Sequence, residues 1–428
     1  MIYNGLIILC FLSVFWIMKK INKNLYVPSM LFTFYWMTNI VVGIMLFGYD
    51  YQWVSFSLYY IFFMCIIFFV VESFFWRNKR DIPEKKKMEL IYKVNDRKVL
   101  IRSVLVFTMV MGFIYVYTLL INHGHNLTAF YSLENLINTS HTYSVMRYGG
   151  GEENSTILGQ IMLSTTYFGW LFSGFIYPFT LKRKDRTTGI FCFLILLPTI
   201  LMVLVSNGKT SLVFGLILWA TGYLLSNQFV NIKINFALIK KIILLITVAF
   251  VVFAMAFYIR YGGAEFSKIN NRIITYGIGH VPAFDEWFGG YHITWFGETY
   301  GSSTFNAIFR FLGLPIINEN SANFVTETKY GITNVHTLFS NVLLDFGIIG
   351  SFIFFILLGG VSGLLLTVLR RKKISALNIT SIGLLYFCIL YSFLISPLKY
   401  TSLIFALIEF YLVLKYVLSN KIIKIRIR

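Results

Sequence analysis

Long apolar runs, separated by short polar segments, follow one another along the whole chain. Each run has 17 or more residues, which is enough for a helix to cross a bilayer. The pattern predicts an all-α polytopic membrane protein in which residues 1–428 form a single integral membrane domain. The first run lacks a basic leader and a small-residue cleavage site, so we expect a retained helix. The eleven predicted spans are 2–18, 28–48, 53–76, 99–121, 157–181, 189–205, 210–226, 238–259, 336–369, 376–396 and 401–418.

The ninth run, 336–369, is too long for a simple span. An unbroken helix of that length would extend about 50 Å at 1.5 Å per residue, whereas the hydrocarbon core is about 30 Å thick. We therefore expect its first turns, HTLFSNVLLDFG, to project into the interface or to form a separate short helix. This places His336 at or above the outer membrane surface.

Basic residues predict the orientation of the spans. Of the 37 Lys and Arg residues, 27 lie in one set of alternate connections, and 8 lie in the other set. Because cytoplasmic connections collect Lys and Arg, the N-terminus is expected outside and the C-terminus in the cytoplasm. The same rule explains the net charge of +19, so a nucleic-acid partner is not expected. The 57% hydrophobic content agrees with a membrane protein.

Three connections are longer than the others. The cytoplasmic connection 77–98 is strongly basic, and we expect it to set orientation and to contact anionic lipid. The outward connections 122–156 and 260–335 are the two long polar segments on the opposite side. A water-facing site is therefore expected outside the cytoplasm, above all in 260–335, which makes cytosolic substrates poor candidates.

Outward cations are the first candidate site residues, because they oppose the usual distribution of charge. Arg suits a diphosphate, since its planar guanidinium donates two parallel hydrogen bonds. The alternative is that these side chains reach phospholipid phosphates, as interfacial Arg and Lys commonly do. The candidates are Arg260 at the end of a span, Lys209 in the turn SNGKTS, Arg147 in MRYGGGEE, and Arg272, Arg310 and Lys329 within the long segment.

Two similar strings, RYGGGE at 147–152 and RYGGAE at 260–265, occur one in each long outward connection. Paired glycines after Arg would let backbone N–H groups approach an anion closely. A matched pair could bind two similar lipid-linked ligands. Chance similarity in a chain rich in Gly and Tyr is the alternative.

His336 is the second candidate, because a neutral imidazole at the interface can accept a proton or hydrogen-bond a phosphate. On a helix, Ser340 would share its face, whereas Asp345 would point to the opposite face together with Asn341. The alternative is an interfacial or capping histidine. His280 and His292 lack metal-ligand spacing, so neither a metal nor a cofactor is predicted.

Carboxylates and aromatic residues complete the candidate chemistry of 260–335. One carboxylate could be the general base for a sugar hydroxyl, although the sequence does not choose among them. The aromatic residues between 284 and 300 suit either stacking on sugar rings or a helix lying in the interface. Gly359 and Gly363 suit helix packing. The carboxylates are Glu265, Asp285, Glu286, Glu298, Glu319 and Glu327, and the aromatic residues are Phe284, Trp287, Phe288, Tyr291, Trp295, Phe296 and Tyr300.

These features together resemble the Wzy-type O-antigen and capsule repeat-unit polymerases. The resemblance lies in the span count, the two long outward loops and the final loop that runs into HTLFSNVLLDFGIIGSFIFFILLGG. The segment 336–350 is also similar to the His-opening segment of the related O-antigen ligases. SNGKTSLVFGL and IRYGG resemble the turn and the span-end Arg of such polymerases. The family's Arg-to-Gly spacing is not reproduced here.

The resemblance implies a metal-independent glycosyltransferase of the lipid-carrier, GT-C-like architecture in a bacterial inner membrane, with its active site on the periplasmic side. Donor and acceptor would both be oligosaccharides on undecaprenyl diphosphate, and a chain-length regulator protein is a further implied partner. Arg260 and His336 would be catalytic, with Lys209, Arg147, Arg272 and Arg310 at the diphosphates. The alternatives are an O-antigen ligase, or a flippase or transporter for lipid-linked sugar.

Overall fold

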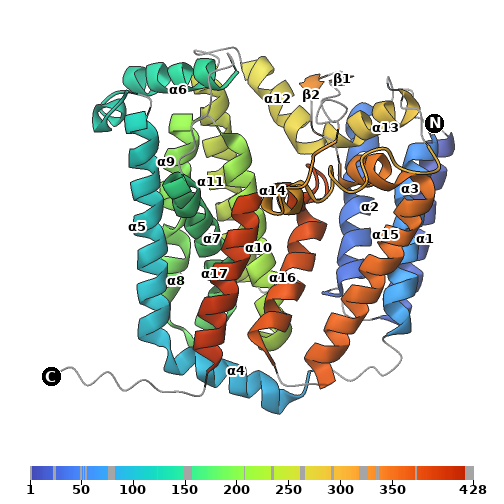
Figure 1. Cartoon of the computed structure of the whole chain (residues 1–428), viewed down its shortest axis with the longest axis horizontal. Helices are drawn as coiled ribbons and strands as arrows, with labels where there is room; N and C mark the ends of the chain where they lie inside the picture. The colour runs from blue at the N-terminus through green and yellow to red at the C-terminus, as the bar shows by residue number, and fades with distance from the viewer. Residues whose placement is uncertain are drawn as a thin grey trace.

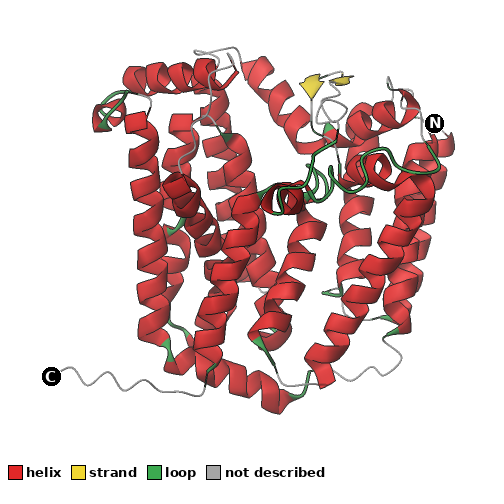
Figure 2. Ribbon diagram, in the orientation of Figure 1, coloured by secondary structure: helices red, strands yellow, loops and turns green. Residues whose placement is uncertain are grey.

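The structure is a computed structural model in which most residues are helical (Figures 1 and 2). The described part of the chain has one sheet, a hairpin of two strands. It describes residues 2–22, 26–48, 51, 53, 55–75, 82–122, 124–148, 157–206, 208–232, 236–260, 266–290, 294–317, 326–328, 330–333, 335, 337–371 and 374–419.

The long helices follow the predicted apolar runs, and a helix lies at each of the eleven predicted ranges. Eight helical segments of the described chain are long and apolar enough to span a membrane. The protein is therefore an all-α polytopic membrane protein, as predicted. The long helices are α1 (Ile2–Ile21), α2 (Pro28–Phe47), α3 (Ser55–Phe74), α5 (Lys98–Asn122), α7 (Ile157–Arg183), α8 (Arg186–Leu194) followed by α9 (Leu196–Ser206), α10 (Lys209–Val230), α11 (Phe236–Arg260), α15 (Leu338–Arg371), α16 (Ala376–Tyr391) and α17 (Thr401–Leu418).

Helix α7 is the centre of the larger hydrophobic core, and almost all of its residues from Ser164 to Thr180 are buried. It packs against α5, α10 and α17. A Cβ at Gly174 would lie 2.0 Å from the Trp219 carbonyl oxygen, and one at Gly222 would lie 2.2 Å from that of Leu171. Small residues therefore bring the α7 and α10 backbones into direct contact, as in other membrane helix pairs.

A second core is formed by α1, α2, α3 and α15. Helix α16 lies between this group and the helices around α7 (Figure 1). Helix α2 begins with Pro28, whose missing N–H costs nothing at a first helical position. Gly359 and Gly363 of α15 face α3, where Cβ atoms would approach Phe68 and Phe75. The predicted packing role of these two glycines is confirmed.

Helix α15 is broken at Gly347, whose backbone is non-helical with φ 65° and ψ −166°. The prediction of a separate short helix at the start of this run is therefore confirmed. The break is built on close backbone contact, because a Cβ at Gly347 would lie 2.6 Å from the Trp295 carbonyl. A Cβ at Gly297 would likewise lie 1.9 Å from the Asp345 carbonyl oxygen. Residues 294–304 are thus pressed against the kink.

Shorter elements cover the two ends of the bundle, mostly within the predicted connections (Figure 1). We call these ends the α12 end and the α4 end. Among the shorter elements, a helix was predicted only for the aromatic stretch 284–300, as one of its two interpretations. These elements are shorter than a membrane span and contain many polar residues, which explains why apolar run length alone did not show them. The α4 end carries α4 (Glu84–Asp96). The α12 end carries η1 (Leu127–Phe130), α6 (Leu133–Tyr148), α12 (Phe266–Ile278), α13 (His280–Gly290), α14 (Asn306–Phe311), β1 (Thr326–Thr328), β2 (Gly331–Thr333) and η3 (Pro397–Lys399).

Candidate functional site

Lys209 is the first residue of α10 at the α12 end, and only 4% of its surface is exposed. This is an unfavourable place for a cation, because the positive end of the helix dipole and the loss of water both oppose its charge. Its Nζ lies 3.9 Å from the centroid of the Phe257 ring, a cation–π contact. A lysine held there in spite of these costs suggests a role for its charge.

Arg260 approaches Lys209 because α11 ends beside the start of α10. Phe257, which contacts Lys209, lies one turn before Arg260. Helix α12 then folds back on the end of α11, and the Tyr276 ring lies 5.4 Å from that of Phe257. The turn between the two helices, 261–265, is outside the described residues, so the glycines of RYGGAE are not placed.

Arg272 is the third member of this cation cluster, which we define as Lys209, Arg260 and Arg272. It lies one turn before Tyr276 on α12, and both Arg260 and Arg272 interact electrostatically with Lys209. Arg272 also donates a hydrogen bond of 2.8 Å from Nη1 to the Ile332 carbonyl oxygen of β2. The cluster is thus joined to the hairpin that precedes α15.

The cluster gathers three positive groups from three separate segments of the chain. Like charges repel at short range, so the arrangement becomes favourable when an anion sits among them. The first turn of α10 adds backbone N–H groups, which helix N-termini offer to phosphates. Lys209 and the two guanidinium groups are therefore suited to a phosphate or diphosphate.

Strand β1 of the hairpin packs against α13, whereas β2 packs against α12 (Figure 1). Glu327 of β1 interacts with Glu286 of α13, and the pKa of Glu286 is raised by partial burial and by this negative charge. A carboxylate with a raised pKa is a better proton acceptor near neutral pH than an ordinary one. The other carboxylate of α13, Asp285, is buried and accepts a hydrogen bond from Ser57, so it has a structural contact.

The other predicted site residues do not all join the cluster. Arg310 is exposed on α14, which packs on η3 and α17 instead of α12. Arg147 lies on α6, which crosses the ends of α9 and α11, but its side chain is outside the described part. His336 and Lys329 also fall outside the described residues, and so do the glycines of RYGGGE.

The aromatic residues between 284 and 300 divide into two groups. Phe284 and Trp287 are buried and pack in the second core, where Phe284 lies 5.9 Å from Phe339. They are not available to sugar rings. Trp295, Phe296 and Tyr300 are exposed by 66%, 73% and 72%, so these three side chains are available for stacking. Phe288 is half-buried, and Tyr291 lies outside the described residues.

His280, the first residue of α13, is fully buried between Trp36 and Phe393, with ring centroids at 6.0 and 5.0 Å. Neither ring nitrogen has a hydrogen-bond partner among the described residues. Within that same part of the chain, His, Cys, Asp and Glu form no group of three suited to a metal. Burial lowers the pKa of His280 to about 3.

This burial predicts a loss of stability in mild acid. Between pH 6.5 and 3 the unfolded chain binds a proton on His280 that the folded chain does not, so stability falls as pH falls. The expected loss at pH 5.5, relative to neutral pH, is about 1.4 kcal/mol for an unfolded pKa of about 6.5. Detergent-denaturation midpoints at pH 7.5 and 5.5 measure it. His280→Phe should flatten the difference, and an unchanged difference in that variant would contradict the assignment to His280.

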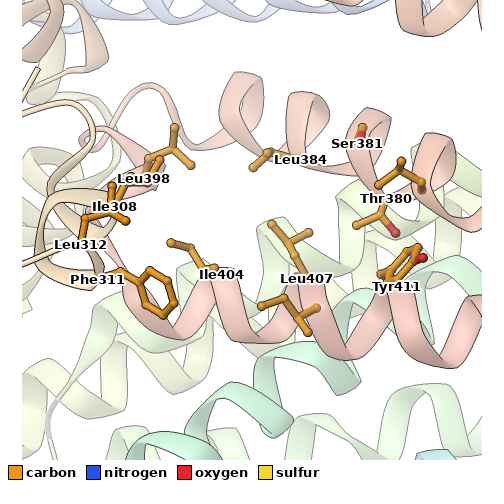
Figure 3. Close-up of a pocket in the computed structure, with 12 residues that line it drawn as sticks. Ile308, Phe311, Leu312, Thr380, Ser381, Leu384, Leu398, Ile404, Leu407 and Tyr411 are labelled. Atoms are coloured by element: carbon orange, nitrogen blue, oxygen red, sulfur yellow. The ribbon is translucent and has the colours of Figure 1, made fainter.

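An apolar groove of about 460 Å³ runs between α16 and α17 below α14 (Figure 3). Ile308 and Phe311 of α14 and the following Leu312 line one end, and Thr380 and Tyr411 line the other. Arg310 lies on the same short helix as the first group. The ring of Phe214, five residues after Lys209, lies 5.4 Å from that of Tyr400. Tyr400 follows η3, whose Leu398 lines the groove, so the α14 end of the groove lies near the start of α10.

Comparisons of the chain with protein-family models, with curated proteins and with solved structures give no match. The chemistry of the site is therefore the basis for a function.

Proposed function

We propose that this protein is a membrane glycosyltransferase that polymerises oligosaccharide repeat units carried on undecaprenyl diphosphate, as its resemblance to the Wzy-type polymerases implies. The observation that carries the proposal is the cation cluster, in which the buried Lys209 interacts electrostatically with Arg260 and Arg272. Such a cluster suits a diphosphate on a lipid-embedded carrier.

The topology completes this proposal. All eleven predicted helices span the inner membrane of a bacterium, including α1, α7 and α16, and the architecture is GT-C-like. The α12 end faces the periplasm, with the N-terminus on that side and the C-terminus in the cytoplasm. The supporting observation is that Lys86 of α4 and other members of the basic set lie at the opposite end of the bundle.

The proposed reaction uses the cation cluster on the α12 side of the hairpin and the carboxylates Glu286 and Glu327 on its α13 side. An acceptor hydroxyl attacks the anomeric carbon of the donor glycan, a C–O bond forms, and the bond to the diphosphate breaks. The hydroxyl proton passes to Glu286 or Glu327, and the leaving undecaprenyl diphosphate keeps the bonding electrons. Preorganised cations stabilise the charge on a leaving diphosphate, which is the role of Lys209, Arg260 and Arg272. His336 stays a catalytic candidate from the sequence.

The groove between α16 and α17 fits the carrier. Its lining is apolar along most of its length, and Arg310 lies on the helix that closes one end. In the proposed complex an isoprenoid segment lies in this groove, and Arg310 is near a diphosphate. This gives Arg310 a binding role separate from the cation cluster.

Deletion of the gene tests the function. Loss of a polymerase leaves surface glycan with a single repeat unit, whereas loss of a ligase leaves none. A gel of surface glycan from the deletion strain, with and without the wild-type gene, separates these results. A ladder of normal length in the deletion strain would rule out the proposed polymerase function.

Transport of lipid-linked sugar is the second candidate, because a carboxylate near the last turn of α3 is buried among the long helices. Glu72 of α3 is buried and accepts hydrogen bonds from Ser29 of α2, including its backbone N–H at 3.2 Å, and from Ser362 of α15. Ionisable residues inside membranes commonly mark transport paths. Purified protein that lengthens lipid-linked glycan in liposomes would exclude transport as its sole function.

A further inference from the structure

Two cavities at the α4 end adjoin each other and differ in character. The first, of about 720 Å³, lies between α7, α8 and α11 and is lined mainly by apolar side chains such as Ile190, Phe193 and Leu244. The second, of about 580 Å³, lies between the start of α5 and the turn from α7 to α8. Lys184, Asp185 and Arg186 line both cavities.

The second cavity is strongly basic. Its lining has one carboxylate, Asp185, and five basic residues: Lys98, Arg102, Arg183, Lys184 and Arg186. Asp185 is paired with Lys98 at 3.1 Å and with Arg102 at 3.0 Å. Burial acts against ionisation of Asp185, but hydrogen bonds from Thr188 and Lys98 and the charge of Lys98 lower its pKa to about 2. The pocket therefore keeps a large positive excess.

Several of these cations are held in place by the fold. Arg102 donates from Nε to the Thr188 hydroxyl at 2.9 Å, which fixes its guanidinium against the start of α8. Arg183 donates to the Ile91 carbonyl oxygen of α4. Lys184 and Arg186, by contrast, are exposed at the junction of the two cavities. They are the side chains best placed to meet a ligand that occupies both.

The backbone at Lys184 is left-handed at the end of α7. Lys184 follows α7 with φ 59°, and the Asp185 N–H bonds the Thr180 carbonyl oxygen at 3.0 Å. The Lys184 N–H bonds that of Leu181 at 3.3 Å, which completes a Schellman end. Glycine is the favoured residue at this position, because a side chain is strained at positive φ. Lys184→Gly is therefore a substitution that this backbone accepts.

We propose that these joined cavities bind one anionic phospholipid, with its phosphate at Lys184 and Arg186 and its acyl chains against α8 and α11. A free phosphate would use the basic cavity alone, whereas a phospholipid occupies both. Basic pockets between membrane helices are typical sites for such head groups. The bound lipid joins α4, α5, α7 and α11 at the end of the central helix. This site is independent of the function proposed above.

Lipid binding by the purified full-length protein, measured by native mass spectrometry with phosphatidylglycerol and phosphatidylcholine, tests the proposal. The wild-type protein should bind phosphatidylglycerol at least about tenfold more tightly than phosphatidylcholine. Lys184→Gly should fold normally, because glycine relieves the strain, yet should bind phosphatidylglycerol about fivefold more weakly, as expected for one basic contact. Adding Arg186→Gln should bring the loss to roughly 25-fold.

Matched controls separate this site from general charge and general lipid contact. Lys415→Gln removes an exposed cation at the same end of the bundle, outside both cavities, and should leave binding unchanged. Leu244→Ser should weaken binding, whereas Ile246→Ser should not, since both are about equally exposed on α11 but only Leu244 lines the cavity. Equal binding of both lipids, wild-type binding by Lys184→Gly, or displacement of the lipid by millimolar inorganic phosphate would overturn the proposal.

Discussion

Asp345→Ala is expected to lower the free energy of unfolding by about 2–6 kcal/mol, because two N–H donors would lose their acceptor at about 1–3 kcal/mol each. Asp345 is 1% exposed in the short first part of α15. Its carboxylate accepts from the Ser303 N–H at 2.9 Å, from the Thr304 N–H and from the Thr299 hydroxyl. One side chain thus holds residues 299–304 against the kink at Gly347.

Denaturation of the purified protein in mixed micelles measures this effect. Asp345→Asn should also destabilise, since its amide group would direct a second donor at the Thr304 N–H. Glu298→Ala is the control, because the Glu298 side chain is exposed and its backbone N–H still bonds the Leu344 carbonyl oxygen at 2.8 Å. A denaturation midpoint for Asp345→Ala equal to that of the control would contradict the structural role.

This segment shows how far the sequence could lead. Helical spacing predicted that Asp345 and Asn341 share a face, and both contact Ser303, the second through a hydrogen bond of 2.6 Å from its amide nitrogen. The excess length of the run predicted that its first turns would project into the interface or form a separate short helix, and the break at Gly347 makes them a short helix. The partner residues could not be predicted, because backbone N–H groups of an irregular segment have no pattern in the sequence. Their pairing depends on close packing around Gly297 and Gly347.

The candidate site was predictable in part for a similar reason. Charge sorting placed Lys209, Arg260 and Arg272 on one side of the membrane, and the structure brings these three together. Charge sorting did not separate these three residues from Arg310, which lies on α14. That separation depends on how α12 folds back on α11 through Phe257 and Tyr276. The proximity of Glu286 to Glu327 likewise depends on the hairpin, whose strands are too short to show a strand pattern in the sequence.

The packing of the two cores explains why the site lies where these segments meet. Phe47 and Tyr330 connect the hairpin to the end of α2, with ring centroids 5.0 Å apart, and Arg272 connects it to α12. The hairpin therefore joins the group of helices around α2 to the group around α10. A ligand bound to the cation cluster would contact elements from both groups.

Arg260→Ala and Lys209→Met are each expected to lower the rate of glycan extension by about 100- to 1000-fold, the usual effect of removing one group that stabilises a developing anion. Arg260→Lys should lie between these variants and wild type, because it keeps the charge but loses the bidentate geometry. Extension of lipid-linked glycan in proteoliposomes, or the glycan ladder in a complemented deletion strain, measures the rate.

Stability separates this role from a structural one. If Lys209 served packing alone, Lys209→Met would leave the ladder intact, since methionine fills a similar volume and removes repulsion from Arg260 and Arg272. The proposed role predicts the opposite combination, in which unfolding occurs at an equal or higher denaturant concentration and the ladder shortens to one repeat. Lys268→Met removes an exposed cation from α12 and should preserve the ladder. Full-length glycan in the Lys209→Met, Arg260→Ala double variant, with the protein present in the membrane, would disprove the role of the cluster.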